Sequence, residues 1–495
     1  MRPNRTREDV TDTEDAAYWS DRVRSFKLSF SFELGTLSRL RFSTYLTLHF
    51  YDSNTTRLLQ RLRLHLLMQA FLRRFFCLPK KPTSTRKPFS TSHRMSSSGI
   101  AVSLYAATIS PASVTGAEPE EAKDKLHHLK DGKGFTNPWD SWIELSGSSI
   151  AKAMIMRRLK GTANRPDTTP PTVTVRKPDF LPSRSTDTLR ATWLGHACYF
   201  VEFPGGFRVL FDPVFSERCS PFTWLGPKRY TDVPCQIEDI PTIDAVVISH
   251  NHYDHMDHPT ITKIKAKHPK VHFFVPLGNK KWFAESGINE GVTELDWWEQ
   301  RDIDLATSAS KPAVSKTDVK SDLAEEKSIS ARIGCLPCQH TSARTLFDKG
   351  LTLWASWSVE SGGKKVWFGG DTGYRAVPEL PKGVDDYDEE HVYPRCPAFK
   401  DIGDLRGPFD LGLIPIGAYD PRWVMSPMHA NPFDSVEIYK DTKCKRAMGI
   451  HWGTWVLTEE DVLEPPQLLK KALTRSGIPD TGVFDVCEVG ESRQF

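Results

Sequence analysis

Residues 249–258 of this 495-residue chain read Ser-His-Asn-His-Tyr-Asp-His-Met-Asp-His and directly follow a short apolar run. Alternate side chains of an extended segment point the same way, so His250 and His252 can converge on one ion. Asp254 and His255 then turn toward a second ion. Imidazole and carboxylate ligands suit Zn²⁺, with Fe or Mn as alternatives, and the lack of a thiolate in this stretch argues against a closed structural zinc site. The stretch therefore predicts an open metal site at the end of a strand.

Three further candidate ligands, His340, Asp371 and His451, come just after apolar runs elsewhere in the chain. Open α/β proteins commonly collect site residues from the ends of several strands in this way. The two oxygens of Asp371 can bridge two ions, so that each ion holds three protein ligands and shares a water. By spacing alone, each of the three residues is as readily an ordinary buried or surface residue, and the sequence leaves both interpretations open.

Other metal or phosphate motifs are weak or missing in the sequence. Cys335 and Cys338 form a CxxC pair that could be half of a zinc knuckle, but no second CxxC exists, so we expect two buried thiols in a strand. His268, His272 and His391 stand alone and are interpreted as core or surface residues. No P-loop, GxSxG or HExxH sequence is present.

Short apolar runs that end in polar turns recur from Arg190 onward and predict buried strands. The runs are 191–203, 207–211, 245–248, 271–275, 332–336, 353–359, 365–368, 411–416 and 447–450, and the helix candidates between them are 259–267, 279–286 and 466–476. Strands that alternate with helices favour a layered α/β fold. The polar stretch 302–329 and the acidic, proline-containing stretch 376–409 are interpreted as surface insertions.

Charge is distributed unevenly along the chain. The 65 Lys and Arg residues against 62 Asp and Glu give a formal net charge of +3 at pH 7. Residues 53–117 contain ten Lys or Arg and no acidic residue, so residues 118–495 carry a net charge of −7 once the balanced residues 1–52 are set aside. We therefore divide the chain into a basic arm, residues 1–117, and a mildly acidic domain, residues 118–495.

The sequence of the arm shows no membrane span and no secretory signal. Its best apolar stretch, 58–78, is interrupted by arginines, whereas a bilayer requires roughly 20 apolar residues in a row. Within it, 58–76 has the spacing of an Arg-rich amphipathic helix and 80–98 the composition of a linker. An organelle-targeting or membrane-surface segment is one interpretation. A disordered tail, or a gene-model extension with the true start at Met95, is the other.

The metal-binding stretch and its flanking blocks resemble the metallo-β-lactamase superfamily, and within it the N-acyl-phosphatidylethanolamine-hydrolysing phospholipase D family. The HxHxDH core specifies only the superfamily, whereas the ordered blocks from about residue 130 to the C-terminus are more specific. These blocks are F-T-N-P-W (135–139), T-W-L-G-H-A (192–197), D-P-V-F-S (212–216), G-P-K-R (226–229), E-L-D-W-W (294–298), G-D-T-G-Y (370–374), I-P-I-G-A-Y (414–419) and H-W-G-T (451–454).

The resemblance implies an αββα sandwich, preceded here by a basic, largely disordered N-terminal arm, with two Zn²⁺ ions per chain at one edge. It implies that His250, His252 and His340 hold one zinc, that Asp254, His255 and His451 hold the other, and that Asp371 bridges them. Tyr253 and His429 are implied to contact the substrate, and Asp254, Asp371 and His429 are taken as catalytic.

The activity that the resemblance implies is phospholipase D-type hydrolysis of N-acyl-phosphatidylethanolamine to N-acylethanolamine and phosphatidate. We expect attack of a metal-bridging hydroxide at phosphorus. The expected partners are a phospholipid substrate and a membrane surface, without nucleic acid, and a homodimer is left open. The expected location is peripheral to an intracellular membrane, with the mitochondrion as one candidate compartment.

Two other functions compete with this one. A nuclease, or an ester or lactone hydrolase, can use the same fold, but a nuclease requires a basic groove and residues 118–495 carry −7. A non-catalytic, membrane-associated metal-binding scaffold would be marked by loss of a ligand, and all seven candidate ligands are present.

Overall fold

The computed structural model describes residues 105–184, 186–307, 329–381 and 383–495. The amphipathic helix expected at 58–76, the linker at 80–98 and the targeting or disordered character of the arm lie outside these residues. So does most of the first insertion, residues 308–328.

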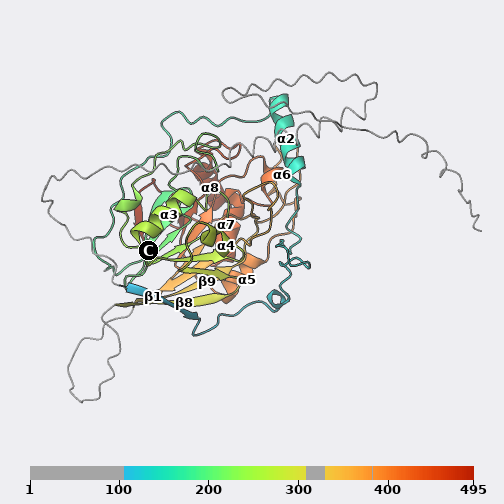
Figure 1. Cartoon of the computed structure of the whole chain (residues 1–495). Coiled ribbons are helices and arrows are strands. Elements are labelled where there is room, and N and C mark those ends of the chain that lie inside the picture. The colour runs from blue at the N-terminus through green and yellow to red at the C-terminus, as the bar shows by residue number, and fades with distance from the viewer. Residues whose placement is uncertain (1–104, 185, 308–328, 382) are drawn as a thin grey trace, which may run out of the picture. The chain divides into compact units, whose positions relative to one another are not determined.

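The strands of the described residues form two mixed sheets (Figure 1). The eight-stranded sheet has the order β1 (Tyr105–Pro111), β8 (Gln300–Thr307), β9 (Ile329–Leu336), β10 (Ser356–Ser361), β11 (Lys364–Phe368), β12 (Leu411–Pro415), β13 (Ala447–Ile450) and β14 (Phe484–Asp485). The seven-stranded sheet has the order β15 (Ser492–Gln494), β2 (Arg190–Gly195), β3 (Cys198–Glu202), β4 (Arg208–Phe211), β5 (Ala245–Val247), β6 (His272–Pro276) and β7 (Val292–Leu295). Within each sheet, the run from β4 to β7 or from β11 to β14 is parallel.

Alternation along the strands explains why the two sheets stack. Tyr199 and Val201 of β3 belong to a buried cluster that also contains Trp357 of β10, so these side chains lie between the sheets. Phe200 points to the opposite face because successive side chains of a strand alternate. There it joins a second cluster with Ile261 of α3.

Helices cover both outer faces of the stacked sheets. The helices are α2 (Gly147–Lys160), α3 (His258–Lys267), α4 (Lys280–Glu285), α5 (Ala398–Leu405), α6 (Arg422–Met425), α7 (Pro432–Asp441) and α8 (Glu464–Arg475), with short 3₁₀ turns at Glu120–Asp124 and Ile237–Asp239. Helices α3 and α4 pack on the seven-stranded sheet, whereas α7 packs on β12 and is flanked by α5 and α8. The result is the αββα sandwich that the sequence predicts. Helix α2 lies apart from the sheets, at the top of Figure 1.

Two segments interpreted as surface insertions contain regular structure. Residues 302–307 belong to β8, because Ile303 and Leu305 alternate with Asp302 and Asp304 and are buried in the core between the sheets. In the stretch 376–409, α5 buries Phe399 and forms from Ala398 onward. The prediction of peripheral loops is therefore wrong for these two parts.

The eight-stranded sheet includes residues on the N-terminal side of the boundary drawn between residues 117 and 118. Strand β1 pairs antiparallel with β8 over seven residues, from Tyr105 opposite Thr307 to Pro111 opposite Arg301. The sheet thus extends into the stretch assigned to the basic arm. None of the helices in the described ranges is both long and apolar enough to span a bilayer.

Candidate metal centre

The candidate ligands follow the ends of strands from both sheets. Strand β5 leads into His250, and in the other sheet β9, β11 and β13 lead into His340, Asp371 and His451. Two hydrogen bonds fasten the end of β5 to the opposite sheet. Trp357 Nε1 donates to Ile248 O at 3.0 Å, and the backbone N–H of Ala355 donates to Ser249 O at 2.9 Å. The site therefore lies at the edge where the sheets meet.

The first group of ligand atoms comes from His250, His252 and His340. His250 Nε2 lies 2.8 Å from His252 Nδ1, and His340 Nε2 lies 3.3 Å from the same atom. The three rings stand nearly perpendicular to one another, with interplanar angles of 82°, 78° and 83°. Their nitrogens thus converge on one point, which is the arrangement that binding one ion requires.

The second group comes from Asp254, His255 and His451, joined by His196. Asp254 Oδ2 lies 3.5 Å from His255 Nε2 and 3.4 Å from His451 Nε2. It also lies 3.1 Å from His196 Nε2, a residue that the sequence analysis did not single out as part of the site.

Asp371 lies between the two groups. Its Oδ2 is 3.1 Å from His255 Nε2 and 3.0 Å from His451 Nε2 on one side. On the other side, it is 3.8 Å from both His250 Nε2 and His340 Nε2. This central placement is what a carboxylate that bridges two ions requires.

The buried polar atoms of the site fit a pair of metal ions. His255 Nε2, His451 Nε2 and Asp371 Oδ1 have no hydrogen-bond partner although they are buried. Leaving such atoms unpaired is costly, so their convergence calls for a further partner that accepts lone pairs. A divalent cation coordinated by imidazole nitrogens and carboxylate oxygens meets that need.

Hydrogen bonds behind the ligands fix which ring nitrogen is free. His255 Nδ1 lies 2.7 Å from Asp212 Oδ2, which leaves Nε2 for a metal. His340 Nδ1 donates to Met428 O at 2.9 Å, and His250 Nδ1 lies 2.9 Å from Ser249 Oγ. Partners of this kind orient metal-binding histidines and select their tautomer.

Burial and the neighbouring carboxylates set the charges of the metal-free site. Burial holds the pKa of His250 and of His340 well below the usual 6.5, so both rings are neutral and ready to coordinate. Burial also lowers the pKa of His451, but Asp371 and Asp254 outweigh it and raise that pKa to about 9. Against the effect of burial, the neighbouring carboxylates also raise the pKa of His255 well above its usual value. At pH 7 the rings of His255 and His451 are therefore both protonated on both nitrogens, and a metal must displace one proton from each.

Of the two residues expected to contact the substrate, His429 lies next to the candidate ligands and Tyr253 packs against Arg344. His429 faces the centre, with Nδ1 4.0 Å from Asp371 Oδ2 and its ring 5.1 Å from that of His340. Tyr253 is half-buried beneath the guanidinium of Arg344, which lies 3.9 Å from its ring centroid. The contacts of the Tyr253 ring thus run to Arg344 rather than to the ligands.

Comparison with known proteins settles the family. A model of the Beta-lactamase superfamily domain matches residues 207–452. N-acyl-phosphatidylethanolamine-hydrolyzing phospholipase D 1 of Caenorhabditis elegans is 35% identical over 376 residues, which make up 73% of this chain and 93% of that protein. The chain belongs to the N-acyl-phosphatidylethanolamine-hydrolysing phospholipase D family. With the metallo-β-lactamase fold and this cluster of histidines and carboxylates, it is a metal-dependent hydrolase.

A second sequence relative carries the same family name. The mitochondrial N-acyl-phosphatidylethanolamine-hydrolyzing phospholipase D of Saccharomyces cerevisiae is 32% identical over 290 residues, 58% of this chain and 53% of that protein. Among solved structures, isothiocyanate hydrolase from Delia radicum gut bacteria covers 62% of this chain and 98% of its own, with 15% identity and a TM-score of 0.40. A structural likeness that remote carries no argument about function.

His196, in the family block T-W-L-G-H-A, belongs to the site although nothing in its spacing announces it. It occupies the turn between β2 and β3 with φ of +53°. Thr454 Oγ1 accepts from its backbone N–H at 2.7 Å, and its carbonyl accepts from the backbone N–H of His451 at 3.1 Å. The turn thus holds the His196 ring against Asp254 and ties it to the next ligand along the edge.

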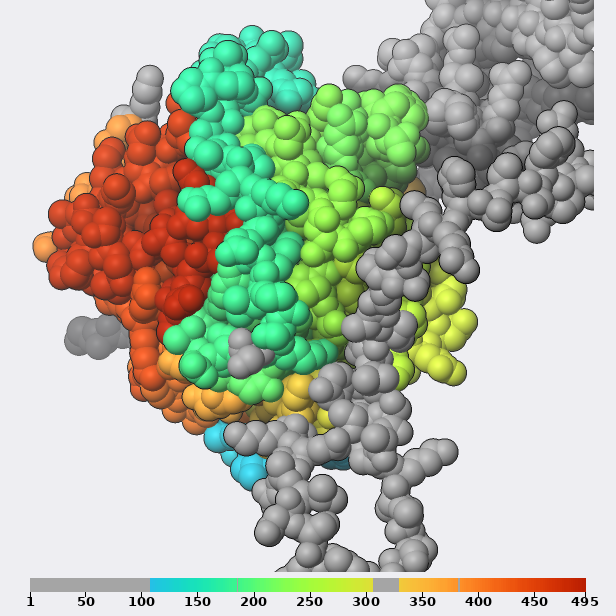
Figure 2. Space-filling model, turned by 90° about the vertical axis from the view of Figure 1, so that its left-hand side faces the viewer, coloured from blue at the N-terminus to red at the C-terminus, as the bar shows by residue number. Residues whose placement is uncertain are grey.

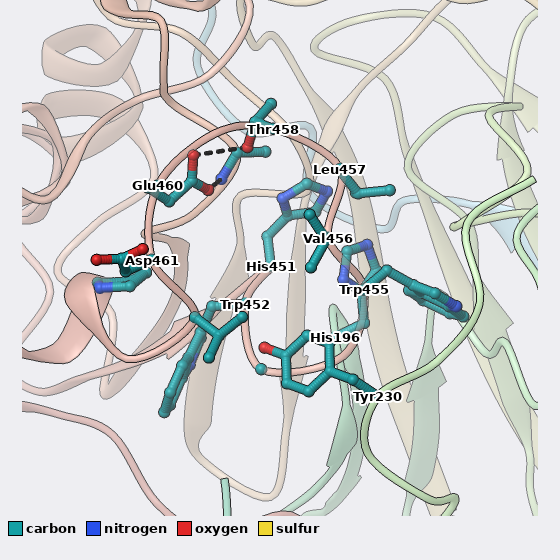
Figure 3. A pocket seen from close by; sticks show the side chains of 14 residues that line it. His196, Tyr230, His451, Trp452, Trp455, Val456, Leu457, Thr458, Glu460 and Asp461 are labelled. Carbon is teal, nitrogen blue, oxygen red and sulfur yellow. Dashed lines mark hydrogen bonds between the residues drawn. The ribbon is translucent and has the colours of Figure 1, made fainter. Parts of the chain in front are cut away.

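A small cavity lies behind this part of the site (Figure 3). It has a volume of about 30 Å³, enough for one water molecule. The rings of His196 and His451 border it with centroids 4.2 Å apart, and Trp455 packs edge-on against His196 at 4.9 Å. The Nδ1 atoms of both histidines are buried without a partner, so the cavity is suited to a water that links them.

The block F-T-N-P-W supports the first group of ligands from outside. Asn137 Nδ2 donates to His340 O at 2.7 Å, and Ser141 Oγ donates to Gln339 Oε1 at 2.5 Å. Gln339 Nε2 in turn donates to Pro427 O at 2.9 Å, two residues before His429. The N-terminal segment thus braces the loops of both histidines.

Proposed function

We propose that the chain is a zinc-dependent phosphodiesterase of the phospholipase D type. It hydrolyses N-acyl-phosphatidylethanolamine to N-acylethanolamine and phosphatidate, with two zinc ions per chain. The observation that carries this proposal is the relative from C. elegans, which is named for this activity and is matched over 93% of its length. The seven candidate ligands at one edge of the sandwich support it.

The residues assigned to the metals divide as the distances divide them. His250, His252 and His340 would hold one zinc, Asp254, His255 and His451 would hold the other, and Asp371 would serve both because it lies between the two groups. Zinc bound there supplies Lewis acidity toward phosphoryl oxygens and lowers the pKa of a water from about 15.7 toward about 7. The burial of the ligands strengthens these interactions because water does not screen them.

The proposed reaction is a single displacement at phosphorus by water. The oxygen of water forms the new P–O bond, and the bond from phosphorus to the N-acylethanolamine oxygen breaks. One proton of the water ends on the leaving alkoxide. We assign the transfer of that proton to Asp254, whose Oδ2 is held by His196 Nε2 at 3.1 Å.

We assign His429 the binding of a phosphoryl oxygen. Its Nδ1 is buried without a partner and faces Asp371. Burial lowers the pKa of His429 to about 3, so the ring is neutral at pH 7 and donates from only one nitrogen. Tyr253 is assigned to the head group, with the guanidinium of Arg344 stacked on its ring.

The remaining parts of the proposal concern where the protein acts. A phospholipid substrate places it at the surface of an intracellular membrane, as a peripheral protein and without nucleic acid as a partner. The mitochondrion is proposed as the compartment because the yeast relative is named as mitochondrial. A homodimer is a further proposal.

Three measurements on the full-length chain test the proposal. Metal analysis is expected to find about two zinc equivalents, and a panel of lipid and nucleic acid substrates is expected to single out N-acyl-phosphatidylethanolamine. Hydrolysis in ¹⁸O-labelled water is expected to place the label in phosphatidate. Label in the released N-acylethanolamine means attack at carbon and refutes the mechanism, and full activity of a metal-free sample refutes the role of zinc.

A further inference from the structure

Helix α2 lies on the surface of the domain, with Ile150, Ala153, Met154 and Arg157 half-buried on one side and the opposite side exposed. None of its 14 residues is fully buried, so the helix contributes no side chain to the hydrophobic core. It begins at an N-cap, where Ser146 Oγ accepts from the backbone N–H of Ser149 at 3.1 Å. It ends at Gly161, whose φ of +68° suits a C-cap that glycine adopts without strain. Figure 2 shows this helix (teal, at the top) standing out from the surface.

The outer face of α2 carries large apolar side chains. Ile155 and Leu159 are 58% and 76% exposed and lie one helical turn apart. Met156, which is 40% exposed, lies beside them. A single exposed leucine is ordinary, but three adjoining large apolar side chains on a solvent-exposed helix mark an interaction surface.

The charge of α2 is entirely positive. The helix contains Lys152, Arg157, Arg158 and Lys160 and no acidic residue. Arg157 pairs with Glu459, with Nη2 2.6 Å from Oε2. The other three cations form no ion pair with any residue in the described ranges. Apolar side chains flanked by cations are the pattern of a helix that lies on an anionic lipid surface.

Helix α2 is attached directly to the segment that borders the metal centre. Its Arg157 and the following Asn164 both bind Glu459, the latter through Nδ2 to the carbonyl oxygen at 2.9 Å. The segment 455–458, next to Glu459, borders the small cavity shared with His196 and His451 (Figure 3). The helix is therefore linked to the metal centre through Glu459 and the segment 455–458.

A second apolar element adjoins α2. The loop 219–228 exposes Phe222, Trp224 and Leu225, and Trp224 is 67% exposed. Lys228 of this loop and Arg158 of α2 line the same groove. Tryptophan is enriched where proteins meet the interfacial region of a bilayer. The two elements flank the same segment of the metal-site rim.

We infer that the outer face of α2, together with the loop 219–228, docks the domain on an anionic lipid bilayer. This inference rests on the proposed function, because a lipid substrate gives the metal centre a reason to lie at a bilayer. The positive charge of α2 favours an anionic bilayer over a second copy of the chain as the binding partner of this face. Two copies of α2 would bring six unpaired cations together without a compensating acid.

The test is co-sedimentation of the full-length chain with two kinds of vesicle, phosphatidylcholine alone and phosphatidylcholine with phosphatidylserine. The paired substitution Ile155→Gln and Leu159→Gln keeps good helix formers and removes the apolar face. It is expected to weaken binding about tenfold or more. The pair Lys152→Gln and Lys160→Gln is expected to weaken binding only to the vesicles with phosphatidylserine, about fivefold for each lysine. Val392→Gln is the matched control, since Val392 is 87% exposed and lies outside this face.

The outcomes separate docking from chemistry. Weaker binding by both pairs, with the control and the turnover of detergent-dispersed substrate unchanged, supports the inference. Wild-type binding by the apolar pair overturns it. A wild-type dimer that the apolar pair converts to a monomer also overturns it, because the face then covers a second copy. A chain that binds through α2 but hydrolyses no N-acyl-phosphatidylethanolamine supports docking and refutes the proposed substrate.

Discussion

Replacing Asp212 by asparagine is expected to damage the second metal position while leaving the fold in place. Asp212 Oδ1 accepts the backbone N–H of Ser249 at 2.7 Å, and Oδ2 accepts from Ser249 Oγ at 2.5 Å and faces His255 Nδ1 at 2.7 Å. These bonds keep the proton of His255 on Nδ1 and its lone pair on Nε2. The φ of +36° at Asp212 is a conformation that asparagine tolerates.

The asparagine side chain has only one way to sit in this position. The backbone N–H of Ser249 requires an acceptor, so the amide oxygen must take the place of Oδ1. The amide nitrogen then stands where Oδ2 stood, 2.7 Å from His255 Nδ1, and donates to it. His255 must carry its proton on Nε2, the atom that faces Asp371, and that tautomer cannot coordinate a metal. Loss of such an outer partner typically costs about 10- to 100-fold in metal affinity or activity.

The assay is zinc binding in competition with a chelator, together with turnover and thermal unfolding. Asp212→Asn is expected to lose the second zinc at a chelator concentration that leaves the wild type with both. Asp244→Asn is the control, because Asp244 is a buried carboxylate of the same sheet that accepts the backbone N–H of Arg208 at 2.8 Å away from the ligands. The control is expected to lose stability and keep its zinc affinity. Wild-type zinc affinity and turnover in Asp212→Asn would falsify the tautomer argument.

Three further outcomes are expected. In His196→Asn, the asparagine tolerates the left-handed turn but is too short to reach Asp254. We expect this variant to bind the second zinc roughly tenfold more weakly in the same chelator assay. Unchanged zinc affinity refutes a role of His196 in positioning Asp254. Zinc binding to the metal-free protein at pH 7 is expected to release about two protons, measured by calorimetry in buffers of different ionisation enthalpy. Because the pKa of His451 is raised to about 9, this ring loses its extra proton as the pH rises from 7 toward that value, and the apparent zinc affinity is expected to rise over the same range; a pH-independent affinity contradicts this. A chain that starts at residue 118 lacks β1 and is expected to unfold at a lower temperature than a chain that starts at Ser98. The shorter chain loses several backbone hydrogen bonds to β8, each of which contributes about 1 kcal/mol. Equal melting temperatures would show that β1 does not stabilise the domain.

The strands that carry the ligands could be predicted from sequence because they are buried on both faces. Runs such as 245–248 and 447–450 are continuously apolar, and the ligands follow them at once. Strand β8 escaped detection because only Ile303 and Leu305 mark its inner face. Its alternation merges with the polar stretch that follows, so a half-buried strand at this position looks like a loop. Helix α2 escaped for another reason, since Ile155, Met156 and Leu159 are exposed and none of its residues is fully buried, so no apolar stripe marks a core-facing side.

The sequence could point to the candidate ligands but not to the residues that hold them in place. Four residues of metal-binding types occur within six positions at 250–255, and this local density predicts a metal site. Asp212 and His196 are single residues far from them in sequence, and only the meeting of strand ends brings them into contact. Their one sequence signal is membership of the blocks D-P-V-F-S and T-W-L-G-H-A, which carries no role by itself.

The way the ligands are shared between the two sheets links metal binding to the stability of the sandwich. Each proposed zinc takes ligands from the β5 loop of one sheet and at least one from the other, His340 in the first group and His451 in the second. Bound metal therefore joins the sheets at an edge where buried, like-charged imidazolium rings of His255 and His451 would otherwise repel each other. A ligand that binds only the folded chain stabilises it by about 2.7 kcal/mol at a concentration one hundred times its dissociation constant. Metals bound between ligands from both sheets would thus be part of what holds the two halves of the sandwich together.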